Sequence, residues 1–435
     1  MGQWRLHVAS GQAIDIAIVD NTVFTAFTNG VYIYNNDTQE GELLTDVNGL
    51  SDIDISSIYY DSIDDVVLVG YENGNIDKIT SDNIYNIPAI KLAQIPNSKR
   101  INRFQRSGDF IYVATDFCVS KLDIVKDEIK DTYYPTDGNY PILDLSFSND
   151  TIFALSSSML KYGLLSNPAL PDVSQWEIDN RLPVLTENTY TEIELFQGKQ
   201  FILFKQEGYG LDSVFYLDDN GVELLTDVPF SLEINSMNIL TESSFAVNMD
   251  GGIYIYDELL INPASYNSAN MYTWISPLRT ARNSAGIWSA DRTKGLFLFT
   301  SAIGYKKYPI VGPYNRDFYS MDWQNDKLAI ASGRLSGKLP SFSKNGIHLF
   351  EEESWNFHNV TNVQAWENKN IWDFVDVAVN PTNTNQVAAA SYSEEPLSVF
   401  DNDSVTLYKD NNSTLEFTEI GNGWALVSSV TYDVD

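Results

Sequence analysis

The stretch "DISSIYYDSIDDVVLVGYENGNIDKIT", residues 54–80, decides the fold. It consists of short apolar, tyrosine-rich runs, and Asp, Asn and Gly separate one run from the next. Alternating β-branched and aromatic residues between such turn residues are typical of antiparallel strands joined by hairpins. We therefore expect three strands here, with turns at residues 62–65 and 72–74, and a fourth strand in the following "NIYNIPAI".

The same pattern recurs along the chain at a spacing of roughly 45 residues, which is the length of one propeller blade of four antiparallel strands. The hexapeptide "ELLTDV" stands at residues 42–47 and again, unchanged, at 223–228. A turn glycine followed by alternating aliphatic and aromatic residues recurs in "NGVYIY", "GGIYIY", "KGLFLF" and "NGIHLF". We therefore interpret the repeating unit as a blade.

Nine such units can be placed on the sequence, and a tenth begins in the last ten residues. The first strands of the nine are expected at residues 13–20, 54–61, 101–108, 142–149, 191–198, 234–241, 278–286, 317–324 and 373–380, and the tenth starts at "LVSSVTYDVD", residues 426–435. Single propellers close at about four to eight blades. We predict an all-β fold in which residues 1–310 form a seven-bladed β-propeller. Residues 311–435 then hold the initial blades of a second propeller or, alternatively, the remaining blades of a discontinuous first one.

The N-terminus carries a short sequence that matches an outer strand further along the chain. "WRLH" at residues 4–7 is similar to "WNFH" at residues 355–358, in the expected outer strand of the eighth unit. We therefore expect the N-terminal segment to add an outer strand to the last blade of its ring. Such a strand would leave no exposed sheet edge at the join.

Composition agrees with an all-β globular fold and restricts the partners. Aromatic residues make up 13% of the chain and apolar residues 43%, which suits strands and can fill a sizeable core. The formal net charge of -32 opposes binding to nucleic acid or to an anionic bilayer. No run approaches the roughly 20 apolar residues of a membrane-spanning helix.

The residue types that catalysis needs are scarce. Cys118 is the only cysteine, so an intramolecular disulfide and a Cys-based zinc site are excluded, and we expect its side chain in the core. The three histidines, His7, His348 and His358, lack any nucleophile motif such as GxSxG and are interpreted as structural. "SGRLSGKLP", residues 332–340, has the wrong spacing for a phosphate loop. We interpret it as an extended loop inside the eighth unit, and predict no enzyme activity, no cofactor and no metal.

Acidic pairs offer the main alternative to that prediction. Asp64 and Asp65, Asp218 and Asp219, and Asp401 with Asp403 could supply converging carboxylates for a glycosidase or for calcium. Each pair stands beside Asn or Gly at an expected hairpin. Because Asp favours turns for its own backbone hydrogen bonds, we interpret these pairs as turn residues.

Two basic islands stand out against the acidic background. The first carries Lys99, Arg100, Arg103 and Arg106; the second contains Arg279, Arg282, Arg292, Lys294, Lys306 and Lys307. If their loops converge on one propeller face they could bind an anionic partner, because Arg matches carboxylate and phosphate groups bidentately. The six candidates for this site are Lys99, Arg100, Arg103, Arg106, Arg279 and Arg282. The alternative interpretation is that they neutralise neighbouring acids.

Several motifs together carry a resemblance to known proteins. "NGLSDIDISSIYYD" resembles the repeat of two-component-regulator propellers. More narrowly, "WRLH", "NGLSD", "GYENGNIDKI", "IWSADRTKGL" and "DVAVNPTNTNQVAAASY", in this order, resemble the N-terminal propeller region of the PorZ-type components of the type IX secretion system. The motifs extend from Trp4 to about Tyr392, and the ordered set is more specific than any one of them.

The resemblance implies a function at the cell surface of a Bacteroidetes bacterium. PorZ-type proteins are non-enzymatic and exported, and work in the attachment complex that joins secreted cargo to anionic lipopolysaccharide. We therefore expect a scaffold peripheral to the outer membrane, whose partners are the sortase, other attachment-complex proteins and the lipopolysaccharide. A signal peptide is not expected within this chain.

Two other functions stay open. The first is the periplasmic, oligosaccharide-sensing propeller of a hybrid two-component system. The second is a polysaccharide lyase or hydrolase on the same fold, which would need an acid-base pair such as Asp64 and Asp65.

Overall fold

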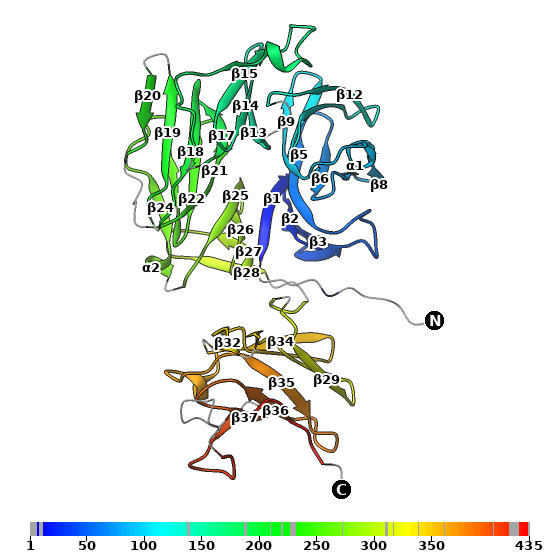
Figure 1. Cartoon of the computed structure of the whole chain (residues 1–435), viewed down its shortest axis with the longest axis vertical. Helices are drawn as coiled ribbons and strands as arrows, with labels where there is room; N and C mark the ends of the chain where they lie inside the picture. Colours follow the sequence, from blue (N-terminus) through cyan, green and yellow to red (C-terminus); the bar gives the residue numbers. More distant parts are fainter. Residues whose placement is uncertain are drawn as a thin grey trace. The chain divides into compact units, whose positions relative to one another are not determined.

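The structure is a computed structural model that describes residues 7, 12–136, 140–186, 189–208, 210–218, 221–226, 232–271, 273–308, 312–315, 317–337, 339–360, 362–402, 404–416 and 426–433. Its described residues form β-sheets joined by turns, with only short helical segments (Figure 1). The predicted all-β fold class is confirmed. The chain divides into two compact units: the larger holds residues 12–310, and the smaller holds residues 7–11 and 311–435.

The first unit contains seven four-stranded antiparallel sheets, here called blades one to seven. Within each blade the four strands pair in chain order. The strands of blades one to four are β1 (Ala13–Val19), β2 (Thr22–Phe27), β3 (Gly30–Asn35), β4 (Glu40–Leu44); β5 (Ile55–Asp61), β6 (Val66–Tyr71), β7 (Ile76–Ile79), β8 (Ile84–Asn86); β9 (Ile101–Ser107), β10 (Phe110–Thr115), β11 (Val119–Asp123), β12 (Glu128–Tyr133); and β13 (Ile142–Ser148), β14 (Thr151–Ser156), β15 (Leu160–Leu164), β16 (Glu177–Ile178).

Blades five to seven follow the same order. Their strands are β17 (Thr189–Phe196), β18 (Lys199–Lys205), β19 (Ser213–Asp218), β20 (Gly221–Leu224); β21 (Ile234–Thr241), β22 (Ser244–Met249), β23 (Gly252–Tyr256), β24 (Ala264–Asn267); and β25 (Pro277–Asn283), β26 (Gly286–Asp291), β27 (Gly295–Phe299), β28 (Tyr305–Tyr308). The short helices α1 (Ala89–Leu92), η1 (Val173–Gln175) and α2 (Ser268–Met271) lie in the connections. Neither α1 nor α2, each of four residues, is long enough to cross a membrane, and the same holds for every helix in the described ranges.

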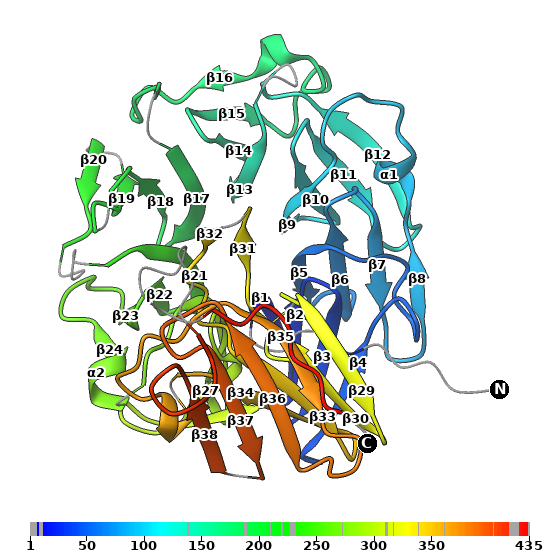
Figure 2. The same ribbon diagram turned by 60° about the horizontal axis from the view of Figure 1, so that its bottom comes forward.

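The seven blades close into a ring. The first strands β1, β5, β9, β13, β17, β21 and β25 contact one another in this order, and β25 contacts β1 again. Figure 2 shows β1, β5, β9, β13, β17 and β21 around a common centre, with the later strands of their blades outside them. At the closure Tyr34 of blade one packs against Trp288 and Tyr308 of blade seven, with ring centroids 5.9 and 4.5 Å apart. Blade seven takes its four strands from the single segment 277–308.

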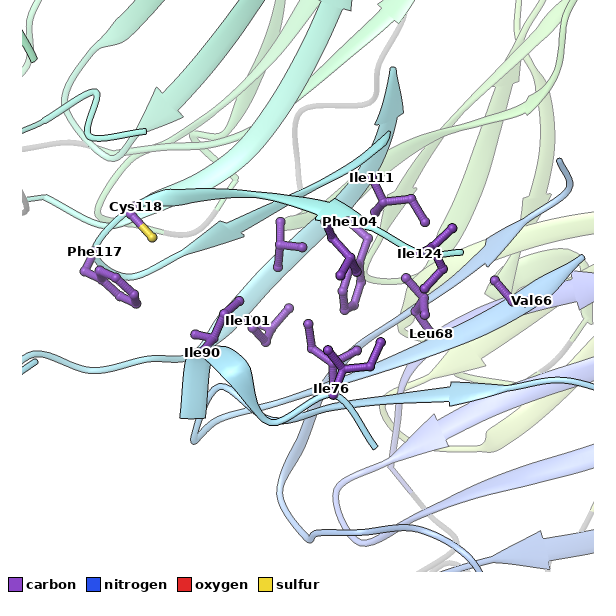
Figure 3. Packing of buried hydrophobic residues seen from close by; sticks show 13 residues of the cluster. Val66, Leu68, Ile76, Ile90, Ile101, Phe104, Ile111, Phe117, Cys118 and Ile124 are labelled. Carbon is purple, nitrogen blue, oxygen red and sulfur yellow. The ribbon is translucent and has the colours of Figure 1, made fainter. Parts of the chain in front are cut away.

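Burial across each blade explains the sequence pattern. Every residue of β6, "VVLVGY", is buried, because a second strand has blades on both of its faces. The outer strand β20 is instead largely exposed. Between blades two and three, Leu68 and Ile76 pack with Ile101 and Phe104 (Figure 3). Each such fully buried side chain stabilises the fold by about 1.5–3 kcal/mol.

Two sequence predictions on single segments are settled here. The turns expected at residues 62–65 and 72–74 are present, and Gly74 adopts a φ of 84°, which favours glycine. Cys118 is fully buried in the core between blades two and three, as predicted. Burial raises the pKa of its thiol to about 11, so the thiol stays protonated near neutral pH.

The second unit contains two further four-stranded sheets. Blade eight is formed by β29 (Ser320–Gln324), β30 (Lys327–Ala331), β33 (Ile347–Glu351) and β34 (Ser354–His358), and blade nine by β35 (Phe374–Val379), β36 (Gln386–Ser391), β37 (Leu397–Asp401) and β38 (Ser404–Tyr408). A hairpin of β31 (Leu335–Ser336) and β32 (Leu339–Pro340) is inserted between β30 and β33, and η2 (Gln364–Trp366) precedes blade nine. The hairpin is the segment "SGRLSGKLP", which therefore is an extension inside blade eight.

His7 belongs to the second unit. Its ring packs on Phe350 and Trp355 of blade eight at centroid distances of 4.9 and 5.5 Å. Trp355 Nε1 donates a hydrogen bond of 3.0 Å to His7 Nδ1. The rest of the predicted N-terminal strand, residues 4–6, lies outside the described residues, so that prediction stays open.

Residues 426–433 lie beside β35 where the next unit was predicted to begin. Asp376 of β35 accepts hydrogen bonds from Val430 N at 2.9 Å and from Ser429 Oγ at 2.7 Å. In the first unit Asp15 of β1 likewise accepts from Ile58 N of β5 at 3.0 Å. Segment 426–433 thus sits beside blade nine as β5 sits beside blade one. The assignment of residues 311–435 to a second propeller remains a prediction.

Candidate binding site in the channel of the ring

A β-bulge near the start of each innermost strand of the ring brings one residue to the same level of the central channel. The register shifts next to this position in all seven first strands. Bulges re-aim a side chain and occur next to functional sites. The seven equivalent residues are Asp15, Ser57, Arg103, Asp144, Glu192, Ser236 and Arg279.

Three carboxylates at this level bind the backbone of the next blade. Asp15 accepts from Ile58 N, Asp144 Oδ2 accepts from Ile193 N at 3.0 Å, and Glu192 Oε2 accepts from Met237 N at 2.7 Å. Each acceptor satisfies a backbone N–H that the bulge leaves outside the strand ladder. The acidic residues therefore hold neighbouring blades together.

The two arginines at this level form ion pairs across the channel. Arg103 of blade three lies with its Nη2 2.6 Å from Glu194 Oε1 of blade five and with its Nε 3.4 Å from Asp144 Oδ1 of blade four. Arg279 of blade seven pairs with Glu192 of blade five and donates to Met237 O at 2.7 Å. Non-adjacent blades are thereby linked through the centre.

Burial changes the proton affinity of these groups. It raises the pKa of Glu194 to about 7, although Arg103 works against the shift. Burial also raises the pKa values of Asp144 and Glu192 above their ordinary values. For Arg103, the neighbouring carboxylates outweigh the lowering by burial, so its pKa is raised and the guanidinium stays charged.

Four of the seven bulge residues, Asp15, Ser57, Arg103 and Arg279, together with Glu194 line a cavity of about 390 Å³. Polar groups on its wall include Asp15, Arg103, Glu194, Asn238 and Arg279, and the apolar part comes from aliphatic residues of the same strands. The cavity lies in the size range of small-molecule sites, but its wall is more polar than usual for such a site, with three arginines and two carboxylates among the lining residues.

The structure separates the basic residues that the sequence grouped together. Lys99 Nζ donates to Lys91 O at 2.6 Å, and Arg100 pairs with Glu72. Arg106 pairs with Asp61 and Asp64, at 2.5 and 2.6 Å. Lys99 and Arg100 precede β9, whereas Arg106 lies near the end of this strand. The length of β9 therefore separates their side chains.

Of the six predicted ligand-binding residues, Arg103 and Arg279 meet at one cavity, and Arg282 also lines it. Arg282 is exposed. The other five make hydrogen bonds or ion pairs within the first unit. This favours the neutralising interpretation, while binding of an anionic partner stays a prediction.

Sequence reasoning missed the acidic half of the network. Asp15, Asp144, Glu192 and Glu194 stand in strands of alternating pattern such as "AIDIA" and "YTEIE". An acid inside an apolar strand, repeated at the same step of several units, is the signal that could have found them. Asp64 and Asp65, which were singled out, lie in the turn 62–65 as expected, and Asp219 and Asp403 fall outside the described residues.

The histidines of the second unit sit in aromatic packing. His348 is fully buried, with its Nδ1 2.8 Å from Ser332 Oγ, and its ring lies 4.8 Å from that of Phe357. Burial lowers its pKa to about 3, so the imidazole is neutral. His358 packs on Phe400, with centroids 5.1 Å apart. Among the residues the structure describes, no three His, Cys, Asp or Glu side chains are grouped as metal ligands.

The closed ring of four-stranded antiparallel sheets, with its side-chain-lined channel, defines the first unit as a β-propeller. Residues 23–177 match the family model described as "TSS9, PorZ, N-terminal beta-propeller domain". Residues 23–177 are therefore similar to the PorZ N-terminal propeller domain, and the resemblance found in the sequence is confirmed.

One solved structure shares this fold. The structure of PorZ, described as an essential bacterial surface component of the type IX secretion system of Porphyromonas gingivalis, superposes with a TM-score of 0.78 at 21% identity. The match covers 100% of this chain and 56% of that one, so the chain spans little more than half the length of that relative. The WD40 propeller of Doa1, at 12% identity and a TM-score of 0.48, covers 67% of this chain and 92% of its own. No curated protein matches the chain.

Proposed function

We propose that this chain belongs to a PorZ-type component of a type IX secretion system and works at the cell surface as a non-enzymatic scaffold. The observation that carries the proposal is the match of residues 23–177 to the PorZ propeller family. The superposition of the whole chain on a PorZ structure supports it.

The finer role proposed is assistance to the sortase in anchoring cargo to anionic lipopolysaccharide. A rigid propeller suits such a role, because its strands hold many loops on two broad faces while the loop sequences vary freely. The partners would be the sortase and other attachment-complex proteins, with the chain exported and peripheral to the outer membrane.

We also propose that the protein catalyses no reaction. Asp64, the carboxylate that an acid-base mechanism would use, is engaged by Arg106 at 2.6 Å. His348, the most buried histidine of the second unit, is held among aromatic rings with a strongly lowered pKa. Both arrangements favour structural roles.

Deletion of the gene in its own bacterium tests the proposal. We expect cargo proteins to lose their attachment to the outer surface, measured by protease shaving and fractionation, and a plasmid copy to restore it. A changed transcription of polysaccharide-utilisation genes with normal cargo attachment would instead establish the two-component alternative.

A pull-down tests the partners. We expect the tagged chain to recover the sortase from detergent-solubilised outer membranes. Charge reversal of Lys99 and Arg282 should reduce the recovery if the basic residues contact an anionic partner. If this double variant recovers as much sortase as the parent chain, Lys99 and Arg282 do not contact the partner.

A further inference from the structure

The connections between strands fall on two faces of the ring in the first unit. The seven first strands run in the same direction, since the bulge near the start of each lies at one level of the channel. Because the strands of each blade are antiparallel and pair in chain order, the first-to-second and third-to-fourth connections share one face, here called the turn face. Ala13 and Tyr308, where the polypeptide enters and leaves the seven blades, lie on the opposite face.

Aspartate recurs throughout the turn face of blades one to four. Both turn-face connections of each of these blades hold at least one aspartate. They are residues 20–21, 36–39, 62–65, 80–83, 108–109, 124–127, 149–150 and 165–176, here called the acidic sector. Lys126 is the only basic residue of the acidic sector, and its Nζ lies 3.0 Å from Asp123 Oδ2. The opposite face of the same blades is mixed, because its connections carry Lys91, Lys99 and Arg100.

Basic residues of the adjoining strands neutralise only part of this charge. The ion pairs join Arg106 with Asp64, Lys78 with Asp127 and Lys130 with Glu128. Within the described residues, Asp82 and Asp109 are exposed and make neither an ion pair nor a side-chain hydrogen bond. Five further aspartates of the acidic sector have no ion pair with a described residue: Asp20, Asp37, Asp65, Asp150 and Asp172. The acidic sector therefore keeps an excess of unpaired carboxylates.

Turn geometry does not account for all of these carboxylates. Asp20, Asp65 and Asp127 adopt positive φ, which aspartate and asparagine tolerate better than most residues. Asp82 and Asp109 do not adopt it. Since their carboxylates also make no hydrogen bond to the described part of the chain, a neutral polar residue would serve these two turns equally well. The charge at positions 82 and 109 is therefore free to contact another molecule.

Two aliphatic side chains protrude from the acidic sector. Val125, 75% exposed, and Ile63, 69% exposed, are the two most exposed large apolar side chains in the described part of blades one to four. Ile124 is buried in the core between blades two and three, so the turn directs the neighbouring Val125 outward. A single exposed aliphatic residue needs no explanation. Two of them, on the same two adjacent blades as Asp82 and Asp109, offer apolar and ionic contacts on one face.

We propose that the acidic sector docks a partner protein whose contacting surface combines Lys or Arg side chains with apolar ones. The carboxylates pair with the cations, and Ile63 and Val125 contact the apolar side chains. Charge complementarity selects this occupant, because the sector repels nucleic acid, an anionic membrane and a second copy of the chain, whose net charge is -32. The inference concerns the first unit alone and does not rest on the proposed secretion role.

Calorimetry of the whole chain with three synthetic peptides at low ionic strength tests the proposal. The Lys-Leu peptide, acetyl-Lys-Leu-Lys-Gly-Lys-Leu-Lys-amide, offers cations and apolar side chains. The Lys-Ser peptide has Ser in place of each Leu, and the Glu-Leu peptide has Glu in place of each Lys. We expect saturable binding of the Lys-Leu peptide, about fivefold weaker binding of the Lys-Ser peptide and none of the Glu-Leu peptide. Absence of saturable Lys-Leu binding, or equal affinity for the first two peptides, would overturn the proposal.

A charge variant tests the carboxylates. Asp82→Asn combined with Asp109→Asn removes two charges and no hydrogen bond, and we expect it to bind the Lys-Leu peptide about threefold or more weakly. The matched control combines Asp46→Asn with Glu207→Gln, which removes two exposed charges from the opposite face. We expect the control to bind as the parent chain does. Equal weakening in both variants would contradict the proposal, because it would indicate attraction to the acidic surface in general.

A second variant keeps every charge and removes the apolar contacts. In Ile63→Ser combined with Val125→Ser, the affinity for the Lys-Leu peptide should fall to that for the Lys-Ser peptide. Val47, 52% exposed on the opposite face, supplies the control, and Val47→Ser should bind the Lys-Leu peptide as the parent chain does. Circular dichroism checks that each variant is folded. Unchanged Lys-Leu affinity in the folded double variant would place the peptide elsewhere and reject the site.

Sedimentation velocity of the chain alone tests the competing occupant, a second copy. We expect no self-association that depends on Ile63 and Val125. A dimer of the parent chain that dissociates when Ile63→Ser and Val125→Ser are introduced together would identify a second copy as the occupant. That result would overturn the proposal of a basic partner.

Discussion

At the scale of single residues, Glu194 links the stability of the ring to pH. Its pKa is raised from the ordinary value to about 7, so the folded ring binds more protons than the unfolded chain between about pH 5 and 7. Stability therefore falls as pH rises through this interval. The neutral amide of Glu194→Gln should remove this dependence and stabilise the ring at pH 8 by up to about 3 kcal/mol.

The measurement is thermal unfolding of the parent chain and Glu194→Gln from pH 5 to pH 8. We expect the two midpoints to be close at pH 5 and to separate in favour of the variant as pH rises. Glu223→Gln, which removes a charge from the exposed outer strand β20, should unfold at the same midpoint as the parent chain at each pH. A Glu194→Gln midpoint below that of the parent at pH 8 would show that the ion pair with Arg103 outweighs the burial of the charge.

Gly70 lies where blades two and three approach closely. A Cβ atom at this position would lie 2.6 Å from Ile101 Cγ2 and 2.8 Å from Ile101 Cβ. Gly70→Ala should therefore push the blades apart and destabilise the first unit by about 1–3 kcal/mol in urea unfolding.

Gly198→Ala provides the comparison for this substitution. Its Cβ would meet no atom within 4 Å, and only its φ of 74° disfavours alanine. We expect a cost of about 1–2 kcal/mol there, from the left-handed backbone alone. A cost well below about 1 kcal/mol at Gly70 would mean that the blades separate without penalty.

The sequence predicted the arginines of the channel but not their partners. Arg103 and Glu194 are 91 residues apart in the chain, and Arg279 and Glu192 are 87 apart. Only closure of the ring brings such pairs together, and no local pattern encodes the distance between blades. The basic islands were visible because charges of one sign cluster in sequence, whereas the compensating acids are spread over three blades.

At the scale of elements, a first strand was predicted for every blade, whereas a fourth strand was predicted only for blades two and eight, where the structure confirms it. First and second strands carry alternating or continuous apolar runs because they face other blades. Outer strands such as β8 (Ile84–Asn86) and β16 (Glu177–Ile178) are short and largely exposed. Because these strands pack on few other residues, their sequences need no apolar alternation and are difficult to distinguish from loop sequences. The connection that precedes β16 also contains the short helix η1.

One carboxylate contact between neighbouring first strands recurs in both units. Asp15, Asp144 and Asp376 each accept a backbone N–H of the strand or segment that follows. We expect Asp376→Ala to release segment 426–433 from β35, because it removes the acceptor of Val430 N and of Ser429 Oγ.

Hydrogen exchange followed by mass spectrometry checks this. The amides of residues 426–433 should exchange faster in Asp376→Ala, while those of β10 in the first unit should not change. Glu367→Ala, at an exposed turn position, serves as the control. Unchanged protection of residues 426–433 would show that contacts other than Asp376 hold the segment.

At the scale of the whole molecule, the two units differ in how completely their sheets are covered. In the first unit every first strand has a neighbouring first strand on each side. In the second, Met321 and Trp323 of β29 and Tyr319, which precedes β29, are about half exposed, at 61, 53 and 51%. Met321 and Trp323 stand two residues apart on one strand and so share one face. Such a sheet face, with large apolar residues in a row, is normally covered by another element.

This difference predicts opposite behaviour of two fragments. Residues 12–310 should form a monomer with one cooperative unfolding transition, because the ring is closed and its core lies between its own blades. Residues 311–435 lack His7, which packs on Phe350 and Trp355, and within the described residues Met321 and Trp323 of β29 stay about half exposed. We expect this fragment to bind a hydrophobic dye and to self-associate in sedimentation experiments. Met321→Lys should reduce the association, because a charge on that face opposes apolar contact. A monomeric, dye-free 311–435 fragment would contradict this, since it would mean that two blades can stand alone with an open aromatic face.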